Sequence, residues 1–297
     1  MQTENQLIQL YLWVCEMYDK HPELKYQRLS NNTTAPQLSD QELVTIYLFG
    51  HCQERFKQTA IHQYIRAHWA GWFPHLPSYQ AFNRRLNQLD EVWSVLLSEL
   101  MADQVRPFLT GTPDQVLDSV PIMMAVRGRS TNAKVARELA DKGYCDSKQI
   151  WYHGVKLHFL GARQAQGLPV PLDFSVTKAS CHDLPPLKQQ ELRPLPGPLF
   201  GDKAYIDQET KEMLAANGTT LCTPDKKEKG QTIYHVGQSG LWSRFVSSMR
   251  QPVESVFNWL IGKTDLQDAA RVRSREGLQV HCFGKLTAAL YLFSFYY

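Results

Sequence analysis

The sequence lacks the marks of several large classes of protein. Its six cysteines are scattered and none lies in a Cys-x-x-Cys pair, so we expect neither a zinc site nor a disulfide framework, and a reducing compartment is favoured. The longest apolar tract, LTAALYLFSFYY at residues 286–297, is too short to span a bilayer and predicts a buried helix. The first residues show neither a basic region nor a small-residue cleavage site, so no signal peptide is expected. We therefore expect a soluble, cytoplasmic protein with no membrane contact.

A strong charge of either sign is also missing. The 297 residues carry a formal net charge of +3, which by itself does not indicate a polyanionic partner. Residues 1–110 contain 9 Lys/Arg against 11 Asp/Glu, whereas residues 111–297 contain 23 against 18. A hydrophobic content of 43% is ordinary for a globular protein with a core, and the length allows roughly two domains. The second part of the chain is therefore favoured as the part that faces phosphate groups.

Residues 1–110 are predicted to be helical. The helix expected over residues 78–89 is capped by Ser78 and carries two basic residues, and Arg84 lies outside its apolar stripe. Short helices with a basic third member are compatible with a helix-turn-helix unit that contacts DNA through Arg84 and Arg85. A plain helical bundle with two solvated arginines, or a dimerisation bundle, is the alternative. Further helices are predicted over residues 7–18, from Ser39 or Asp40 onward, and over residues 90–109.

A turn-rich segment, GTPDQ at residues 111–115, separates this region from one of a different character. Five short runs after it have strand composition, and helices are expected between the third and fourth runs and between the last two. This order predicts a mixed α/β layer, so we expect a helical domain at 1–110 and an α/β domain at 111–297. The runs cover residues 115–124, 150–162, 168–180, 197–205 and 219–224.

Three acidic residues lie at unusual places in the second region. Asp118 lies within the first strand run, and Asp202 follows the apolar part of the fourth. Glu254 comes two residues after Pro252, which is tolerated only in the first turn of a helix, so Glu254 is expected near a helix start. An unpaired buried carboxylate is unfavourable by several kcal/mol. These residues therefore need a positive partner, unless each is an ordinary turn or cap residue.

A divalent cation is the simplest shared partner for these acids. Hard carboxylate oxygens suit Mg²⁺ or Mn²⁺, which also accept phosphate oxygens as ligands. Two such ions about 3.5–4 Å apart can activate an attacking oxygen and stabilise a leaving oxygen at phosphorus. Asp118, Asp202 and Glu254 are thus candidate ligands for two metal ions.

Four segments occur in a definite order along this region: LDSVP (117–121), HGVKLHF (153–159), LFGDKAY (199–205) and RQPVESVFNWL (250–260). In this order and separation they resemble the DDE transposases of bacterial insertion sequences. The nearest group is the insertion-sequence 982 family, in which a stretch similar to KVARELADKGYC (134–145) also follows the first acid. The resemblance covers roughly residues 111–290. It is carried by the ordered set, because no single segment is specific.

The resemblance implies an RNase H-like catalytic domain, a mixed sheet flanked by helices, preceded by an all-α region. It assigns the three metal-binding positions to Asp118, Asp202 and Glu254, and the Arg of an Arg-x-x-x-Glu signature to Arg250. One part of that signature differs here: Ser247 stands where a tyrosine precedes this arginine in related transposases, and the lysine expected seven residues after the glutamate is also absent.

Other basic residues are weaker candidates. Lys156 could support the site or simply share one sheet face with His158. Lys203 could contact a phosphate or balance the charge of Asp202, and His182 could approach the scissile phosphate or belong to a helix cap. Arginines at alternate positions could share an edge that binds the DNA backbone, or could line a solvated edge; these are Arg127, Arg129, Arg271, Arg273 and Arg275.

The combined interpretation is a transposase that binds the terminal inverted repeats of its element and carries out divalent-metal-dependent strand cleavage and strand transfer. Its partners would be the double-stranded DNA of the transposon ends and of the target, bound by a homodimer or higher oligomer. Two alternatives stay open: a metal-dependent nuclease on the same acids, and a transposase-derived DNA-binding protein without catalysis.

Overall fold

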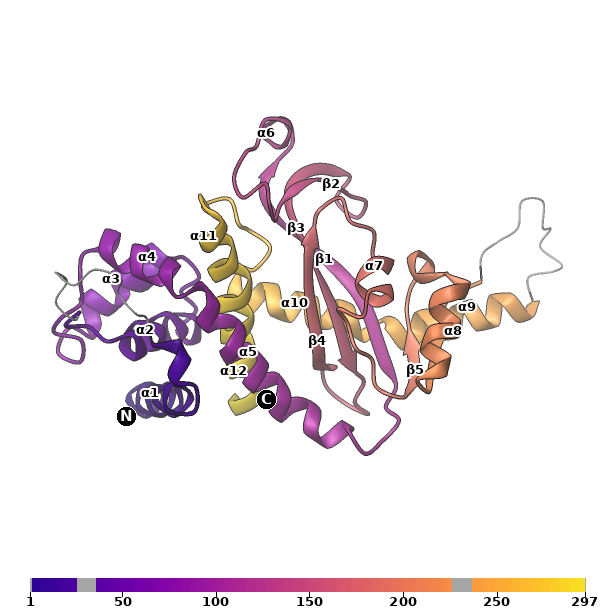
Figure 1. The fold of residues 1–297 in the computed structure, drawn as a ribbon, viewed down its shortest axis with the longest axis horizontal. Helices are drawn as coiled ribbons and strands as arrows, with labels where there is room; N and C mark the ends of the chain where they lie inside the picture. The colour runs from indigo at the N-terminus through magenta and orange to yellow at the C-terminus, as the bar shows by residue number, and fades with distance from the viewer. Residues whose placement is uncertain (1, 26–35, 226–236, 297) are drawn as a thin grey trace. The chain divides into compact units, whose positions relative to one another are not determined.

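The computed structural model describes residues 2–25, 36–225 and 237–296. They form two compact units (Figure 1). The helical unit contains residues 1–100, 262–266 and 272–297, and the sheet unit contains residues 101–261 and 267–271. Sequence analysis expected one boundary near residue 110. In the structure, the C-terminal residues from 272 onward pack within the helical unit.

Two helices of the helical unit begin at caps that the sequence predicted. Ser39 and Glu42 form a reciprocal capping box at the start of α2, and the Ser78 hydroxyl accepts a hydrogen bond from the Ala81 amide at the start of α4. The helix α3 was not predicted. The elements are α1 (Gln2–Lys20), η1 (Pro22–Leu24), α2 (Asp40–Cys52), α3 (Gln58–His68), α4 (Tyr79–Gln88), α5 (Asp90–Val105, which continues into the sheet unit), α11 (Arg275–Gln279), η5 (Val280–Gly284) and α12 (Lys285–Tyr296).

The apolar C-terminal tract forms the buried helix that the sequence predicted. Leu286, Leu290 and Tyr291 of α12 are almost fully buried, and burial of such side chains stabilises the unit by about 1.5–3 kcal/mol each. Just before α12, Gly284 allows a close approach, because a Cβ there would lie 3.0 Å from Tyr47. None of the helices in the described part of the chain is both long and apolar enough to cross a bilayer.

The sheet unit is built on a mixed sheet of six strands. β1 pairs antiparallel with β3 and parallel with β5, β5 pairs parallel with β6, and β3 pairs with both β2 and β4 along its other edge. This confirms the predicted α/β class. The five predicted strands form, and the unpredicted β2 is the sixth. The strands are β1 (Gln115–Val126), β2 (Asp141–Cys145), β3 (Ile150–Ala162), β4 (Val170–Lys178), β5 (Gly197–Phe200) and β6 (Thr219–Cys222).

Helices cover both faces of this sheet. On one face, Leu117 and Leu160 pack with Leu187 of α7 and Leu214 of α8. On the other face, Phe200 packs against Val246 of α9, and Phe159 contacts Phe257 of α10 with ring centroids 5.9 Å apart. Side chains alternate between the faces of a strand, so Asp118 lies on the face covered by α9 and α10. The remaining elements are η2 (Arg106–Phe108), α6 (Gly128–Thr131), α7 (Leu184–Lys188), η3 (Lys203–Tyr205), α8 (Gln208–Ala216), α9 (Gly237–Arg250) and α10 (Pro252–Thr264).

The helical unit holds one buried and one half-buried histidine beside a lysine. His51 is buried and neither ring nitrogen has a hydrogen-bond partner in the described residues. The ring of His281 bonds to the Leu266 carbonyl, and Lys285 donates to the Asp265 carbonyl at 2.8 Å. Burial, followed by the charge of Lys285, lowers the pKa of His281 to about 3 and holds the pKa of His51 well below its usual value. Both imidazoles are therefore neutral in the folded protein.

We expect acid to destabilise the helical unit through these imidazoles. Their pKa values are lower in the folded state than in the unfolded state, so the stability present above about pH 6.5 is lost as the pH falls toward the folded values, by about 1.4 kcal/mol per pH unit for each histidine. Urea denaturation between about pH 7.5 and pH 5 should show His51→Phe losing less stability than the wild-type chain. His75→Gln, at an exposed position, should keep the wild-type slope, and an unchanged slope in His51→Phe would contradict the assignment.

Candidate active site between β1 and the end of β5

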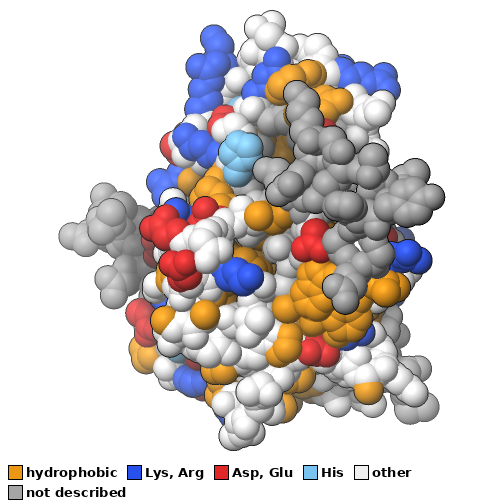
Figure 2. Space-filling view, turned by 90° about the vertical axis from the view of Figure 1, so that its right-hand side faces the viewer, with side chains coloured by type: hydrophobic (Ala, Val, Ile, Leu, Met, Phe, Trp, Pro, Cys, Tyr) orange, Lys and Arg blue, Asp and Glu red, His pale blue; other side chains and the backbone are white. Residues whose placement is uncertain are grey.

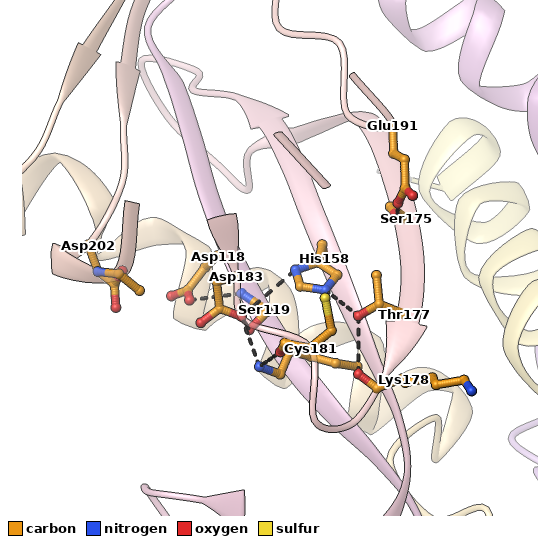
Figure 3. A network of polar contacts seen from close by, with 12 residues as sticks. Asp118, Ser119, His158, Ser175, Thr177, Lys178, Cys181, Asp183, Glu191 and Asp202 are labelled. Carbon is orange, nitrogen blue, oxygen red and sulfur yellow. Dashed lines mark hydrogen bonds and ion pairs between the residues drawn. The ribbon is translucent and has the colours of Figure 1, made fainter. Parts of the chain in front are cut away.

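Two of the three predicted acids lie in register on neighbouring strands. In the parallel pair of β1 and β5, Val116 is the partner of Phe200, and each acid follows two residues later. Asp118 and Asp202 therefore lie at equivalent positions, with Asp118 inside β1 and Asp202 two residues beyond the end of β5. Figure 3 shows their side chains next to each other. The fold thus brings together two carboxylates that are 84 positions apart in the sequence.

The Asp118 carboxylate is held by one arginine and by its own backbone. Arg250 donates to Oδ2 at 2.8 Å, and the Ser119 amide donates to Oδ1 at 2.8 Å. Burial nevertheless raises the pKa of Asp118 to about 6; Arg250 and the Ser119 amide lower it, while the charges of Asp202 and Asp183 raise it. The like charges around Asp118 favour the binding of a proton or of another cation.

Asp202 begins a short turn and borders a buried tyrosine. Its Oδ1 accepts a hydrogen bond from the Ala204 amide at 2.7 Å and so caps η3. In that turn, Tyr205 is buried, and its hydroxyl has no hydrogen-bond partner among the described residues. Burial, followed by the charges of Asp183, Asp118 and Asp202, raises the pKa of Tyr205. Tyr205 is therefore a neutral, buried side chain that lies within the field of three carboxylates.

Asp183 is a third carboxylate, which the sequence offered only together with His182, as a pair that could order the site or form a helix cap. It occupies the N-cap position of α7 but makes no capping bond. Its Oδ1 instead accepts from the Ser119 hydroxyl at 2.6 Å and lies 3.1 Å from Lys156 Nζ (Figure 3). The signal in the sequence was the pair His182-Asp183 after a strand, but the competing cap interpretation is the commoner use of aspartate there.

The strand β3 supplies the base of this polar network. Lys156 and His158 lie on one sheet face, as one interpretation of the sequence had it, and both approach Asp183. Lys156 also donates to the Cys181 carbonyl at 2.7 Å, and His158 Nε2 lies 2.8 Å from the Thr177 hydroxyl. Burial lowers the pKa of His158 to about 4 despite the opposing charge of Asp183. His158 is therefore neutral, and Lys156 is the cation that balances Asp183.

Glu254 lies in the first turn of α10, as predicted, and its side chain is exposed. It comes four residues after Arg250, which contacts Asp118, and three before Phe257, which packs against Phe159 opposite Asp118. Residues at this spacing share one side of a helix, and the Gln251 amide still bonds to the Ser247 carbonyl where α9 ends. Within the described ranges, however, the side chains form no group of three His, Cys, Asp or Glu placed to hold a metal ion.

The other predicted site residues are distributed over the two units. Lys203 and His182 are exposed. Arg85 is largely buried and donates to the Leu38 carbonyl and to Asp40. The remaining basic candidates have exposed side chains; they are Arg84, Arg127, Arg129, Arg271, Arg273 and Arg275.

The donor chemistry of the two aspartates on β1 and after β5 fits a divalent cation. Asp118 and Asp202 offer hard oxygen ligands of the kind that Mg²⁺ and Mn²⁺ prefer. The mutual repulsion that raises the pKa of Asp118 would be relieved by a positive ion between them. Two carboxylates are a sufficient protein contribution, since Mg²⁺ is usually held by one or two carboxylates together with water and phosphate.

Comparison with known proteins gives one family. Residues 110–275 match the family described as the transposase DDE domain, and these residues are more than half of the chain. The match includes both strands of the acid pair and also Glu254. Neither the curated proteins nor the solved structures gave a match.

We expect Asp118→Asn to stabilise the fold in a metal-free buffer. The pKa of Asp118 is higher in the folded state, so its contribution to stability is full below about pH 4 and is lost as the pH rises through about 6. At pH 8 the variant should therefore unfold with a free energy about 2 kcal/mol above that of the wild type, because Asn is neutral and still accepts a bond from Arg250. Urea denaturation in EDTA measures this difference.

The pH dependence of that difference provides the control. It should shrink as the pH falls through about 6 and approach zero below about pH 4, because Asp118 is then protonated in the folded and in the unfolded protein. Asp146→Asn, at an exposed position of the same unit, should change stability little at either pH. A stability gain in Asp118→Asn that is the same at all pH values would show that burial of the charge is not its cause.

Proposed function

Because this chain belongs to the family of transposases with a DDE domain, we propose that it binds the terminal inverted repeats of its element and carries out metal-dependent strand cleavage and strand transfer. The observation that carries the proposal is the register of β1 and β5, which puts Asp118 and Asp202 at equivalent positions on adjacent parallel strands. Transposases of this family act on DNA and generally use divalent metal ions.

Asp118, Asp202 and Glu254 are the residues proposed to hold the metal ions. When bound, divalent ions there would activate the attacking oxygen and stabilise the leaving oxygen at the scissile phosphate. The position of Glu254 between Arg250 and Phe257 along α9 and α10 supports its assignment, since both neighbours contact the part of the sheet around Asp118. The proposal requires the exposed Glu254 side chain to turn toward the two aspartates when metal is bound.

The other residues of the site would orient these acids. Arg250 fixes the Asp118 carboxylate through Oδ2, and the capping bond to Ala204 fixes Asp202. Lys156 neutralises Asp183, which would otherwise add a third unbalanced negative charge where the DNA phosphate must approach. Lys203, exposed beside Asp202, is in a position to contact a phosphate oxygen.

We expect Asp202→Asn to abolish cleavage while preserving the fold and DNA binding. The amide oxygen of Asn can still cap the η3 turn, but the substitution removes a negatively charged metal ligand. Loss of residues that only support metal ligands typically costs about 10–100-fold in activity, so cleavage of a terminal-repeat duplex in Mg²⁺ should fall by more than about 100-fold. Glu254→Gln should behave in the same way, and binding can be measured separately by mobility shift in EDTA.

Glu209→Gln is the matched control for Glu254→Gln. Glu209 also lies exposed in the first turn of a helix of the sheet unit, so its replacement should leave cleavage unchanged. Near-normal cleavage by Asp202→Asn in Mg²⁺ would overturn the acid assignment. Cleavage by the wild type without joining would favour the metal-dependent nuclease, and binding without cleavage would favour a transposase-derived DNA-binding protein.

The exposed arginines are proposed to hold DNA. The candidates for phosphate contacts have exposed side chains; they are Arg127 and Arg129 in the sheet unit, and Arg271, Arg273 and Arg275 before and at the start of α11. In the helical unit, Arg84 is exposed on α4, whereas Arg85 ties α4 to the start of α2 through Asp40 and Leu38. Of these two arginines, only Arg84 is therefore proposed to contact the terminal repeat.

We expect Arg84→Ala to weaken the preference for terminal-repeat DNA and Arg85→Ala to lower the stability of the fold. If Arg84 makes a bidentate base contact, its loss should reduce the preference for terminal-repeat DNA over random duplex by about 5–150-fold, which corresponds to about 1–3 kcal/mol. Arg85→Ala should mainly lower thermal stability, because it leaves Asp40 without its partner. Competition binding with the full chain measures the first effect and thermal melting the second.

Arg106→Ala controls for the loss of one positive charge. Arg106 is exposed and pairs only with the exposed Asp103 among the described residues, so this variant should keep both the preference and the stability. An equal loss of repeat and random binding in Arg84→Ala would mean that Arg84 contacts the DNA backbone without reading bases. Unchanged binding would remove α4 from the DNA interface and favour a dimerisation role for this unit.

A further inference from the structure

Two large aromatic side chains lie exposed at the far end of the sheet from the acids. Tyr144 on β2 and Trp151 on β3 are direct partners in the antiparallel pair, with ring centroids 5.1 Å apart. Tyr144 is 43% exposed and Trp151 is 53% exposed. Single exposed apolar side chains are common on protein surfaces, whereas a contiguous exposed pair is typical of a binding surface.

Positive charge surrounds this aromatic pair. Lys142 lies two residues before Tyr144 on the same face of β2, and its Nζ lies 4.9 Å from the centroid of the Trp151 ring. The amide of Arg127 donates to the Trp151 carbonyl at 3.0 Å, which places α6 and Arg129 beside the pair. At the top of Figure 2, the level at which Figure 1 draws α6 and β2, Lys and Arg side chains surround a hydrophobic patch.

The local charge is large for this chain. Residues 127–148 contain six Lys/Arg and three Asp/Glu, so this short segment has the same net charge, +3, as the whole sequence. Asp141, the acid nearest to Lys142 in sequence, is engaged by the Ser180 amide and hydroxyl. A surface that combines aromatic faces with positive charge suits a ligand that has both π-faces and phosphates.

We propose that Tyr144, Trp151 and Lys142, with Arg127 and Arg129, form a site for unpaired nucleotides of single-stranded DNA. An unpaired base stacks on the exposed aromatic faces, and the arginines contact the flanking phosphates. Base-paired nucleotides cannot use such faces, because their own faces are covered by stacking within the duplex. A second copy of the chain is a poorer occupant, since two such positive surfaces repel each other.

The inference rests on the proposed function, since it takes DNA as the substrate. Val126, where β1 ends next to this site, lies about eight residues beyond Asp118, or roughly 26 Å along an extended strand. One DNA end can therefore contact both places on the sheet unit. The acid pair would act on the phosphodiester, while the aromatic site would hold nucleotides that have separated from their partner strand.

The test compares two fluorescent probes with the full-length chain in EDTA: an oligo(dT) strand and a blunt random duplex of the same length. Trp151→Ala should weaken oligo(dT) binding by about fivefold or more and duplex binding by less than about twofold, because base stacking contributes only to the former. Trp151→Phe should retain most of the oligo(dT) affinity. Quenching of tryptophan fluorescence by oligo(dT) should be weaker in both variants.

Trp72→Ala is the matched control, because Trp72 is 47% exposed but lies in the helical unit; it should bind both probes as the wild type does. Circular dichroism checks that the Trp151 variants stay folded. Equal losses for both probes in Trp151→Ala, or unchanged binding together with a lower oligomeric mass, would overturn the inference and leave the proposed function in place. A wild-type chain that binds neither probe nor terminal-repeat DNA would overturn both.

Discussion

The mutual repulsion of the carboxylates around β1 and the end of β5 is the constraint on which the proposed site depends. Asp118, Asp183 and Asp202 lie within the electrostatic reach of one another, and like charges in a partly buried region repel strongly. Two cations from distant parts of the chain pair with these carboxylates. Arg250, at the end of α9, pairs with Asp118, and Lys156 of β3 pairs with Asp183. Each cation serves one carboxylate, and Asp202 is held by a backbone amide instead.

This arrangement leaves an excess of negative charge, which the proposed metal ions would neutralise. The pKa of Asp118 rises to about 6 although Arg250 contacts it, so burial outweighs the ion pair. A site that is destabilised until it binds a cation is a common compromise between stability and function. The rest of the sheet unit supplies the rigidity, through the packing of α7 and α8 on one face and of α9 and α10 on the other.

The helical unit is built from the two ends of the chain. Its C-terminal helix α12 is almost entirely apolar and is buried within the unit, so the two ends of the chain contribute to one core. The exposed basic residues are the features that connect this unit with the proposed function. Arg84 and Arg85 are sequence neighbours, yet one is exposed and the other is paired with Asp40. Because the two side chains differ in exposure and pairing, a basic dipeptide is a weak indicator of DNA contact.

The sequence by itself determined the local elements and the fold class. Ser39 with Glu42, Ser78 and Pro252 each predicted a helix start that the structure contains, because caps and proline act within a single turn. The order of strand runs and helices predicted the mixed α/β layer, and the ordered segments around Asp118 and Asp202 predicted the family that was then found.

The tertiary structure alone decided the rest. The strand β2 contains charged residues and a glycine, so its extended state depends on pairing with β3 rather than on local propensity. Asp183 joins the site only because β1, β3 and the start of α7 meet in space. Arg250 and Asp118 are 132 residues apart. Sequence patterns report interactions within a turn or a strand. Charges that lie so far apart along the chain are paired only when the folded sheet and its helices bring them together.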